Sequence, residues 1–111
     1  MTQIGSLVRV GDSFRGWLRT LTADIELSIW PSEASAEKAP NYRVYRGDSA
    51  EGLEVGAGWK HHSERAGDYV AIVLDDPSFP HPVRASLVRV DGREDVWALL
   101  WSRPSRRKTA D

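Results

Sequence analysis

The chain has 111 residues, of which 41% are hydrophobic and 28% charged, and its formal net charge is −1. This composition is that of one folded globular domain and not of a disordered or membrane-embedded chain. Cysteine is absent, which excludes disulfide bonds, thiolate metal sites and a cysteine nucleophile.

Alternation of apolar and polar residues with a period of two dominates the sequence, and it predicts β-strands with one buried face. The clearest example is Ile25, Leu27 and Ile29, which alternate with Glu26 and Ser28. Similar runs predict eight strands, in chain order Ile4–Val10, Phe14–Leu21, Asp24–Trp30, Tyr42–Arg46, Leu53–His61, Asp68–Leu74, Val83–Val90 and Val96–Trp101.

Turn signals separate these runs. Glycine and aspartate favour tight turns, and they occur at Gly11-Asp12, Gly47-Asp48, Gly67, the Pro77–Pro82 segment and Asp91-Gly92. Residues 31–41 contain few apolar anchors, so we expect a loop with room for one helical turn. The short turn before Gly67 predicts a hairpin between the fifth and sixth strands. The sixth and eighth strands are apolar on both faces, which is typical of central strands.

The sequence therefore predicts an all-β, mainly antiparallel fold: a single compact sheet, a sandwich or a small barrel of about eight short strands. Periodicity does not choose among these three. We expect one domain over residues 1–103 and a polar basic tail over residues 104–111 that is disordered. The segment after Ser102 has four basic residues and one acid, a charge of +3, which leaves −4 for residues 1–102.

Membrane and secretory segments are not expected. No stretch approaches the ~20 apolar residues that cross a bilayer. Residues 1–7 lack a basic region followed by an apolar one, the pattern of a secretory signal. We expect a cytoplasmic protein without a membrane partner.

Catalytic motifs are also missing from the sequence. No nucleophile elbow, acid–base pair or phosphate-binding glycine loop is present, and we expect a protein that is not an enzyme and needs no cofactor. With cysteine absent, the candidate metal ligands are His61, His62, His81, Asp75 and Asp76. Their spacing matches no metal motif, so we expect no metal. Asp75-Asp76-Pro77 is better explained as a turn that ends a buried strand.

One surface pattern suggests a binding function. Arg15, Trp17 and Arg19 share one face of the second predicted strand, and Arg43 and Tyr45 share one face of the fourth. Cations beside aromatic rings suit single-stranded nucleic acid, because bases stack on the rings and phosphates attract the cations. The same pattern also fits a solvated face on which arginine stems cover apolar surface. Further residues that could extend a nucleic-acid site are Lys60, Arg106, Arg107 and Lys108.

The last predicted strand supports an alternative function. Trp97, Leu99 and Trp101 share one face, while Val96 and Leu100 belong to the other. Both faces need cover, either from the rest of the domain or from a second subunit. The alternative is a protein-interaction or regulatory module, with a homodimer as one form of it.

Several separated motifs resemble one bacterial family, the domain of unknown function 736, and the resemblance covers nearly the whole chain. The motifs are Ile4-Gly5, Phe14 with Gly16, Arg19-Thr20-Leu21, residues 39–44 (APNYRV), residues 55–60 (VGAGWK), residues 74–80 (LDDPSFP) and residues 101–104 (WSRP). The chain departs from the family pattern at Asn41, where Asp is usual, at Gly58, where Ala is usual, and at Trp17, where a small polar residue is usual. The resemblance implies a small proteobacterial protein, often encoded on plasmids or other mobile elements. It implies no known activity, and it transfers no functional residues.

Overall fold

The computed structural model describes residues 2–33, 38–64 and 67–102. These residues form eight β-strands: β1 (Thr2–Val10), β2 (Ser13–Arg19), β3 (Asp24–Pro31), β4 (Tyr42–Arg46), β5 (Glu54–Ser63), β6 (Gly67–Leu74), β7 (Val83–Arg89) and β8 (Val96–Trp101). All eight predicted strands are present, and no boundary differs from its prediction by more than two residues. The period-two pattern was a sufficient signal because each strand buries one row of side chains.

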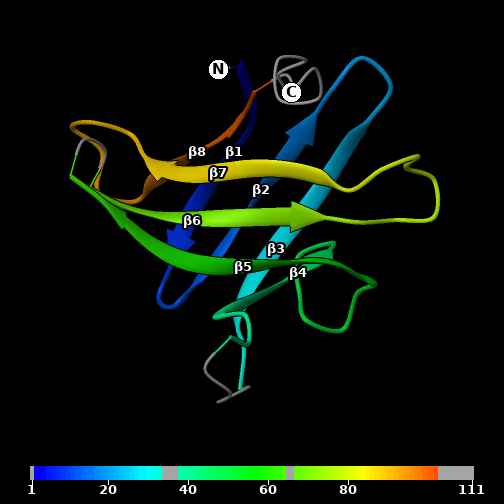
Figure 1. The fold of residues 1–111 in the computed structure, drawn as a ribbon, viewed down its shortest axis with the longest axis horizontal. Coiled ribbons are helices and arrows are strands. Elements are labelled where there is room, and N and C mark those ends of the chain that lie inside the picture. Colours follow the sequence, from blue (N-terminus) through cyan, green and yellow to red (C-terminus); the bar gives the residue numbers. More distant parts are fainter. Residues whose placement is uncertain (1, 34–37, 65–66, 103–111) are drawn as a thin grey trace, which may run out of the picture.

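The eight strands form one closed antiparallel barrel in simple chain order (Figure 1). Each strand pairs with the next along the chain, and β8 pairs with β1, where Leu7 lies opposite Trp97. The fold is thus the small barrel among the three predicted architectures. β6 and β8 each have two paired neighbours, as expected of central strands. Because a closed barrel has no edge strands, the other six strands share this property.

The predicted turns have the backbone conformation that glycine permits. Gly11, Gly47, Gly67 and Gly92 all have positive φ angles, of 62°, 95°, 71° and 78°. The predicted hairpin between β5 and β6 is present, with His62 paired to Asp68 next to the turn. In the 31–41 loop, the N–H of Ser32 donates to the carbonyl of Asn41 and extends the pairing of β3 with β4. The middle of this loop, residues 34–37, and the predicted tail lie outside the described residues.

The hydrophobic core fills the inside of the barrel. Its most completely buried large side chains are Leu7, Phe14, Ile29, Val44, Ile72, Leu74, Leu87 and Leu99. In the predicted apolar row of β3, Leu27 and Ile29 are buried, and Ile25 is partly buried against the core. Among the described residues, no helix has the length and apolarity needed to cross a membrane.

Glycines on the inward rows let the barrel wall close tightly. A Cβ on Gly16 would collide with the carbonyl oxygen of Ser6 and would lie 2.6 Å from the Cα of Leu7. A Cβ on Gly58 would lie 2.9 Å from a methyl carbon of Val70. Both positions therefore need a residue without a side chain, as is common where neighbouring strands approach closely.

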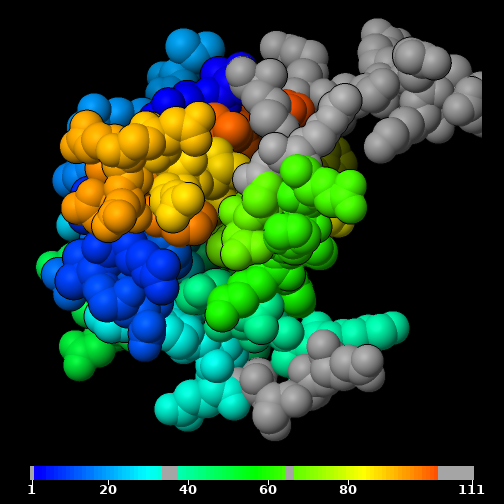
Figure 2. Space-filling model, turned by 90° about the vertical axis from the view of Figure 1, so that its left-hand side faces the viewer, coloured from blue at the N-terminus to red at the C-terminus, as the bar shows by residue number. Residues whose placement is uncertain are grey.

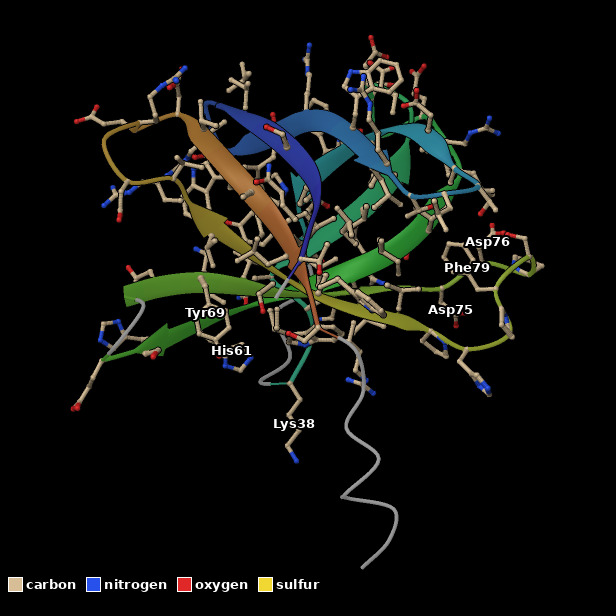
Figure 3. All side chains as sticks on the ribbon, turned by 90° about the horizontal axis from the view of Figure 1, so that it is seen from above. Lys38, His61, Tyr69, Asp75, Asp76 and Phe79 are labelled. Carbon is tan, nitrogen blue, oxygen red and sulfur yellow. The ribbon has the colours of Figure 1, made fainter. Side chains whose placement is uncertain are left out.

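One end of the barrel is closed by the connection between β6 and β7. Phe79 of this connection packs against the core, and Figure 3 shows it beside Asp75 and Asp76. Asp76 accepts a hydrogen bond from the backbone N–H of Ser78 at 2.9 Å and another from the Ser78 hydroxyl. These bonds, with the charge of Arg46, hold the pKa of Asp76 below its ordinary value of 3.8. The predicted Asp-Asp-Pro turn is confirmed for Asp76.

Candidate functional site

The predicted Arg/aromatic row of β2 points outward from the barrel. Arg15, Trp17 and Arg19 are exposed, while their neighbours Phe14 and Leu18 are buried in the core. Trp17 is 45% exposed, which is unusual for a side chain with so much apolar surface. The alternation of β2 therefore places a tryptophan in solvent between two arginines.

The pairing register continues this row across β3 to β4. Arg15 lies opposite Ser28, and Ser28 lies opposite Tyr45. One step further along, Trp30 lies opposite Arg43. Residues that pair directly across neighbouring strands point to the same face of a sheet. The structure thus brings the five predicted residues of β2 and β4 together on one outer face, here called the Arg/aromatic face: Arg15, Trp17, Arg19, Arg43 and Tyr45.

Two arginines of this face lie over tryptophan rings. The guanidinium carbon of Arg19 is 5.9 Å from the ring centroid of Trp17, and that of Arg15 is 5.8 Å from the ring centroid of Trp30. Trp30 was missed as a site residue because the pattern of β3 was used only for its buried apolar row. The same alternation, read for the opposite face, would have identified it.

A groove of about 760 Å³ runs over β1, β2 and β3 on this side of the barrel. Arg15, Trp17 and Arg19 line it from β2, together with Ser6 of β1 and Glu26 of β3. Ser6 and Glu26 lie opposite Trp17 on its two sides. The ring of Trp17 therefore lies in the groove between the polar residues Ser6 and Glu26.

Carboxylates balance part of the positive charge of the Arg/aromatic face. Arg19 forms an ion pair with Asp24 at 3.1 Å, and Arg43 forms one with Glu54 at 3.0 Å. Arg15 has no ion pair within the described part of the chain. Exposed ion pairs of this kind stabilise a fold by only about 0–1 kcal/mol, so a phosphate group can compete for these arginines.

Two buried polar atoms under this face have no hydrogen-bond partner among the described residues. They are the hydroxyl oxygen of Ser28 and the indole nitrogen of Trp30. Ser28 is fully buried although it belongs to the outward row, since it lies between Arg15 and Tyr45. Such groups are rare in folded proteins.

Lys60 does not belong to the Arg/aromatic face. It lies opposite Val70 in the register of β5 with β6, and its ammonium group is 5.6 Å from the ring centroid of Tyr42. Val70 and Tyr42 are both core residues, so Lys60 belongs to an inward row at one end of the barrel. The three predicted tail residues lie outside the described residues: Arg106, Arg107 and Lys108.

The histidines and aspartates considered as metal ligands are not gathered at one place. His61 stacks on Tyr69 with ring centroids 5.5 Å apart, and the Nδ1 of His62 is 2.7 Å from a carboxylate oxygen of Asp68. Figure 3 shows His61 and Tyr69 on the other side of the molecule from Asp75. The described ranges contain no group of three or more His, Asp or Glu side chains placed to hold a metal ion.

The last strand, on which the homodimer prediction rests, has both edges paired inside the barrel. Its inward residues Trp97 and Leu99 are buried in the core. Of its outward row, Ala98 is buried, and Val96 and Leu100 are partly buried in the single chain. Homodimerisation through this strand stays a prediction.

No curated protein and no solved structure shows significant similarity to the chain. A family model described as "Protein of unknown function (DUF736)" matches residues 3–104. This range contains all eight strands of the barrel except the first residue of β1. The chain therefore belongs to the DUF736 family, in agreement with the resemblance of its sequence motifs.

Proposed function

We propose that this protein is a non-enzymatic accessory protein that binds single-stranded nucleic acid on its Arg/aromatic face. The observation that carries the proposal is Trp17, which is 45% exposed in a groove of about 760 Å³ between Arg15 and Arg19. An exposed ring with a guanidinium group on either side offers stacking and phosphate attraction at one point.

Stacking on Trp17 supplies most of the affinity in this proposal. A base stacked on an aromatic side chain contributes about 1–3 kcal/mol. Tyr45 and Trp30 lie across the sheet from Trp17, on the far side of Arg15 and Ser28. A second base stacked near Tyr45 would follow the same outer face, so the site suits an extended single strand better than a rigid duplex.

Phosphate contacts supply the remainder and make binding sensitive to salt. Arg15 is free of ion pairs among the described residues, and Arg19 would exchange Asp24 for a phosphate. Glu26 in the groove and the −4 charge of residues 1–102 oppose a polyanion. The basic tail, with a charge of +3 after Ser102, offsets part of this repulsion. We therefore expect micromolar binding at low salt that weakens as salt is added.

The test is fluorescence anisotropy with a labelled oligothymidylate at about 50 mM salt, where electrostatic contacts are strong. Trp17→Ala should weaken binding about tenfold or more, because one stacked base is lost, and Trp17→Phe should retain part of the affinity. Arg15→Ala should weaken binding and lower its salt dependence. Arg84→Ala is the matched control, because Arg84 is an exposed arginine on the outward row of β7.

Four results would count against the proposal, and the first three concern the single-stranded oligonucleotide. They are no binding of the oligonucleotide at about 50 mM salt, binding that Trp17→Ala leaves unchanged, and equal weakening by Arg84→Ala and Arg15→Ala. Preference for the duplex over the single strand of the same sequence would also contradict it, because a duplex cannot stack its bases on Trp17.

A further inference from the structure

At the barrel end opposite Phe79, the inward rows contain charged residues in place of apolar ones. Along β1 the inward residues are Gly5, Leu7 and then Arg9, which lies opposite Phe14 of the core. Along β5 the inward row reaches Lys60. Two cations therefore stand at the barrel end where the interior pattern would place apolar residues. We call this end the mouth; Figure 2 faces it, with the β1–β2 turn in blue, the β7–β8 turn in orange and the β5–β6 hairpin in green.

Below the two cations lies a floor of three aromatic core residues. The rings of Phe14 and Tyr42 meet edge to face with centroids 5.9 Å apart, and those of Phe14 and Trp97 do so at 5.3 Å. All three side chains are at least nine-tenths buried. Edge-to-face packing fixes the orientation of the rings, so the floor is a preformed apolar surface.

Each cation of the mouth lies over one ring of this floor. The guanidinium carbon of Arg9 is 6.0 Å from the ring centroid of Phe14, and the Lys60 ammonium is 5.6 Å from that of Tyr42. Both side chains are exposed to solvent. Their stems cover apolar surface while their charged ends remain at the opening.

The mouth encloses a pocket of about 460 Å³, lined by Arg9, Lys60 and the aromatic floor, with His62, Asp68 and Tyr69 at its rim. This volume is within the usual range for small-molecule sites, about 300–1,000 Å³. Some eight-stranded barrels hold one small ligand, while others are filled by side chains; here the core fills the interior, and the pocket lies above it at the mouth. The pocket thus has the size of a ligand site, an apolar floor and a charged opening.

The positive charge of the mouth is not neutralised by ion pairs among the described residues. Arg9 donates from Nε to the carbonyl of Gly11 at 3.1 Å, and the carboxylate of Asp68 is engaged by His62. The backbone carbonyl of Asp95, on the neighbouring β8 side of the barrel, accepts a hydrogen bond from the Arg9 N–H at 2.7 Å. No ion pair joins the Asp95 side chain to Arg9 in the described structure.

Trp97 adds a second, independent observation at this pocket. It is 9% exposed and lines the mouth, and its indole N–H has no hydrogen-bond partner among the residues described. A buried donor without a partner is costly, so the floor contains one polar group whose hydrogen bond is unmet among the described residues.

From this geometry we infer that the mouth is a binding site for a small organic anion with an aromatic body. The anionic group binds Arg9 and Lys60, and the aromatic body packs on the floor of Phe14, Tyr42 and Trp97. This site is separate from the Arg/aromatic face, because Arg9 and Lys60 belong to inward rows while Arg15 and Trp17 belong to an outward one.

The test uses two probes that differ only by a sulfonate group: the anion 8-anilinonaphthalene-1-sulfonate and its neutral counterpart N-phenyl-1-naphthylamine. The full chain should bind one sulfonate probe per molecule by calorimetry, about tenfold more tightly than the neutral probe, because charged hydrogen bonds are the strong ones. Binding in more than one copy, or equal affinity for both probes, would overturn the inference.

Charge-removing variants locate the site. Lys60→Met keeps the length and apolar stem of the side chain, and it should weaken the sulfonate probe about tenfold while leaving the neutral probe unchanged. Lys60→Arg should restore the affinity, which distinguishes lost charge from lost folding. Arg9→Met should act like Lys60→Met, and Arg15→Met on the outer face is the matched control. Unchanged sulfonate binding in Lys60→Met, or weakening by Arg15→Met, would contradict the site.

Indole N–H signals in the nuclear magnetic resonance spectrum separate this inference from the proposed function. The sulfonate probe should shift the Trp97 signal and leave that of Trp17 in place, while an oligonucleotide should do the reverse. A shift of Trp17 alone on adding the probe would overturn the mouth site. Failure of the oligonucleotide to bind would leave the probe result unaffected.

Discussion

The two ends of the barrel are made from the same eight strands, yet one is filled and the other is open. At one end, the eight-residue connection 75–82 between β6 and β7 brings Phe79 back against the core. A pocket of about 220 Å³ remains there, against about 460 Å³ at the mouth. At the mouth, the β1–β2 turn has only Gly11 and Asp12 between the strands, and no described residue fills that end as Phe79 fills the other.

This difference shows how one architecture can separate stability from binding. Phe79 completes an apolar interior, so its end adds to stability. Arg9 and Lys60 place charge on inward rows near the open end of the barrel, where water can solvate it. The mouth therefore gives up some apolar burial and gains a charged opening over an aromatic floor.

The largest expected effect is a loss of stability caused by a substitution in the barrel wall, which both ends share. Gly16→Ala should destabilise the protein by about 3 kcal/mol or more, because the new methyl group meets backbone atoms that cannot move aside. Urea unfolding measures this change. Gly11→Ala is the control: its Cβ would meet nothing within 4 Å and only its φ of 62° is strained, so about 1 kcal/mol is expected. Equal losses for the two variants would contradict the crowding argument.

A smaller loss of stability is expected when Phe79, the residue that fills the closed end, is truncated. Phe79→Ala should cost about 2 kcal/mol, less than the ~3–5 kcal/mol of a fully buried phenylalanine, because Phe79 is only partly buried. Thermal and urea unfolding measure the loss. Leu21→Ala, at a fully exposed leucine, should change stability by less than about 0.5 kcal/mol. If both variants are equally stable, Phe79 does not close that end.

The smallest effect concerns the turn that holds Phe79. Removing the hydroxyl in Ser78→Ala should raise the pKa of Asp76 toward 3.8, because the Ser78 side chain is the main cause of its lowering. Since the folded pKa is lowered, the contribution of Asp76 to stability is complete above the unfolded value and is lost as the pH falls through the folded one. In the variant, the folded pKa of Asp76 lies closer to the unfolded one, so stability should depend on pH over a narrower acidic range. Carboxyl carbon chemical shifts measured against pH test this, and an unchanged or lower pKa would contradict it.

Local sequence patterns were sufficient for the strands and for the outer face. The alternation of β2 fixed which side chains point outward, and the structure confirms that Arg15, Trp17 and Arg19 share a face. The same pattern failed for Lys60, because the inward row of β5 contains Gly56 and Gly58 and carries no apolar signal. The larger apolar residue, Trp59, belongs to the other row, where its indole N–H donates to the carbonyl of Lys38 at 3.1 Å.

The sequence by itself determined the eight strands, their turns and the exposed Arg/aromatic pattern, since these depend on residues close together along the chain. Closure of the barrel was decided only by tertiary structure, because the pairing of β1 with β8 joins the two ends of the described chain. The mouth was decided in the same way: Arg9, Phe14, Tyr42, Lys60 and Trp97 come from five different strands. No local pattern records which distant strands meet, so a site built across them becomes visible only once the barrel has closed.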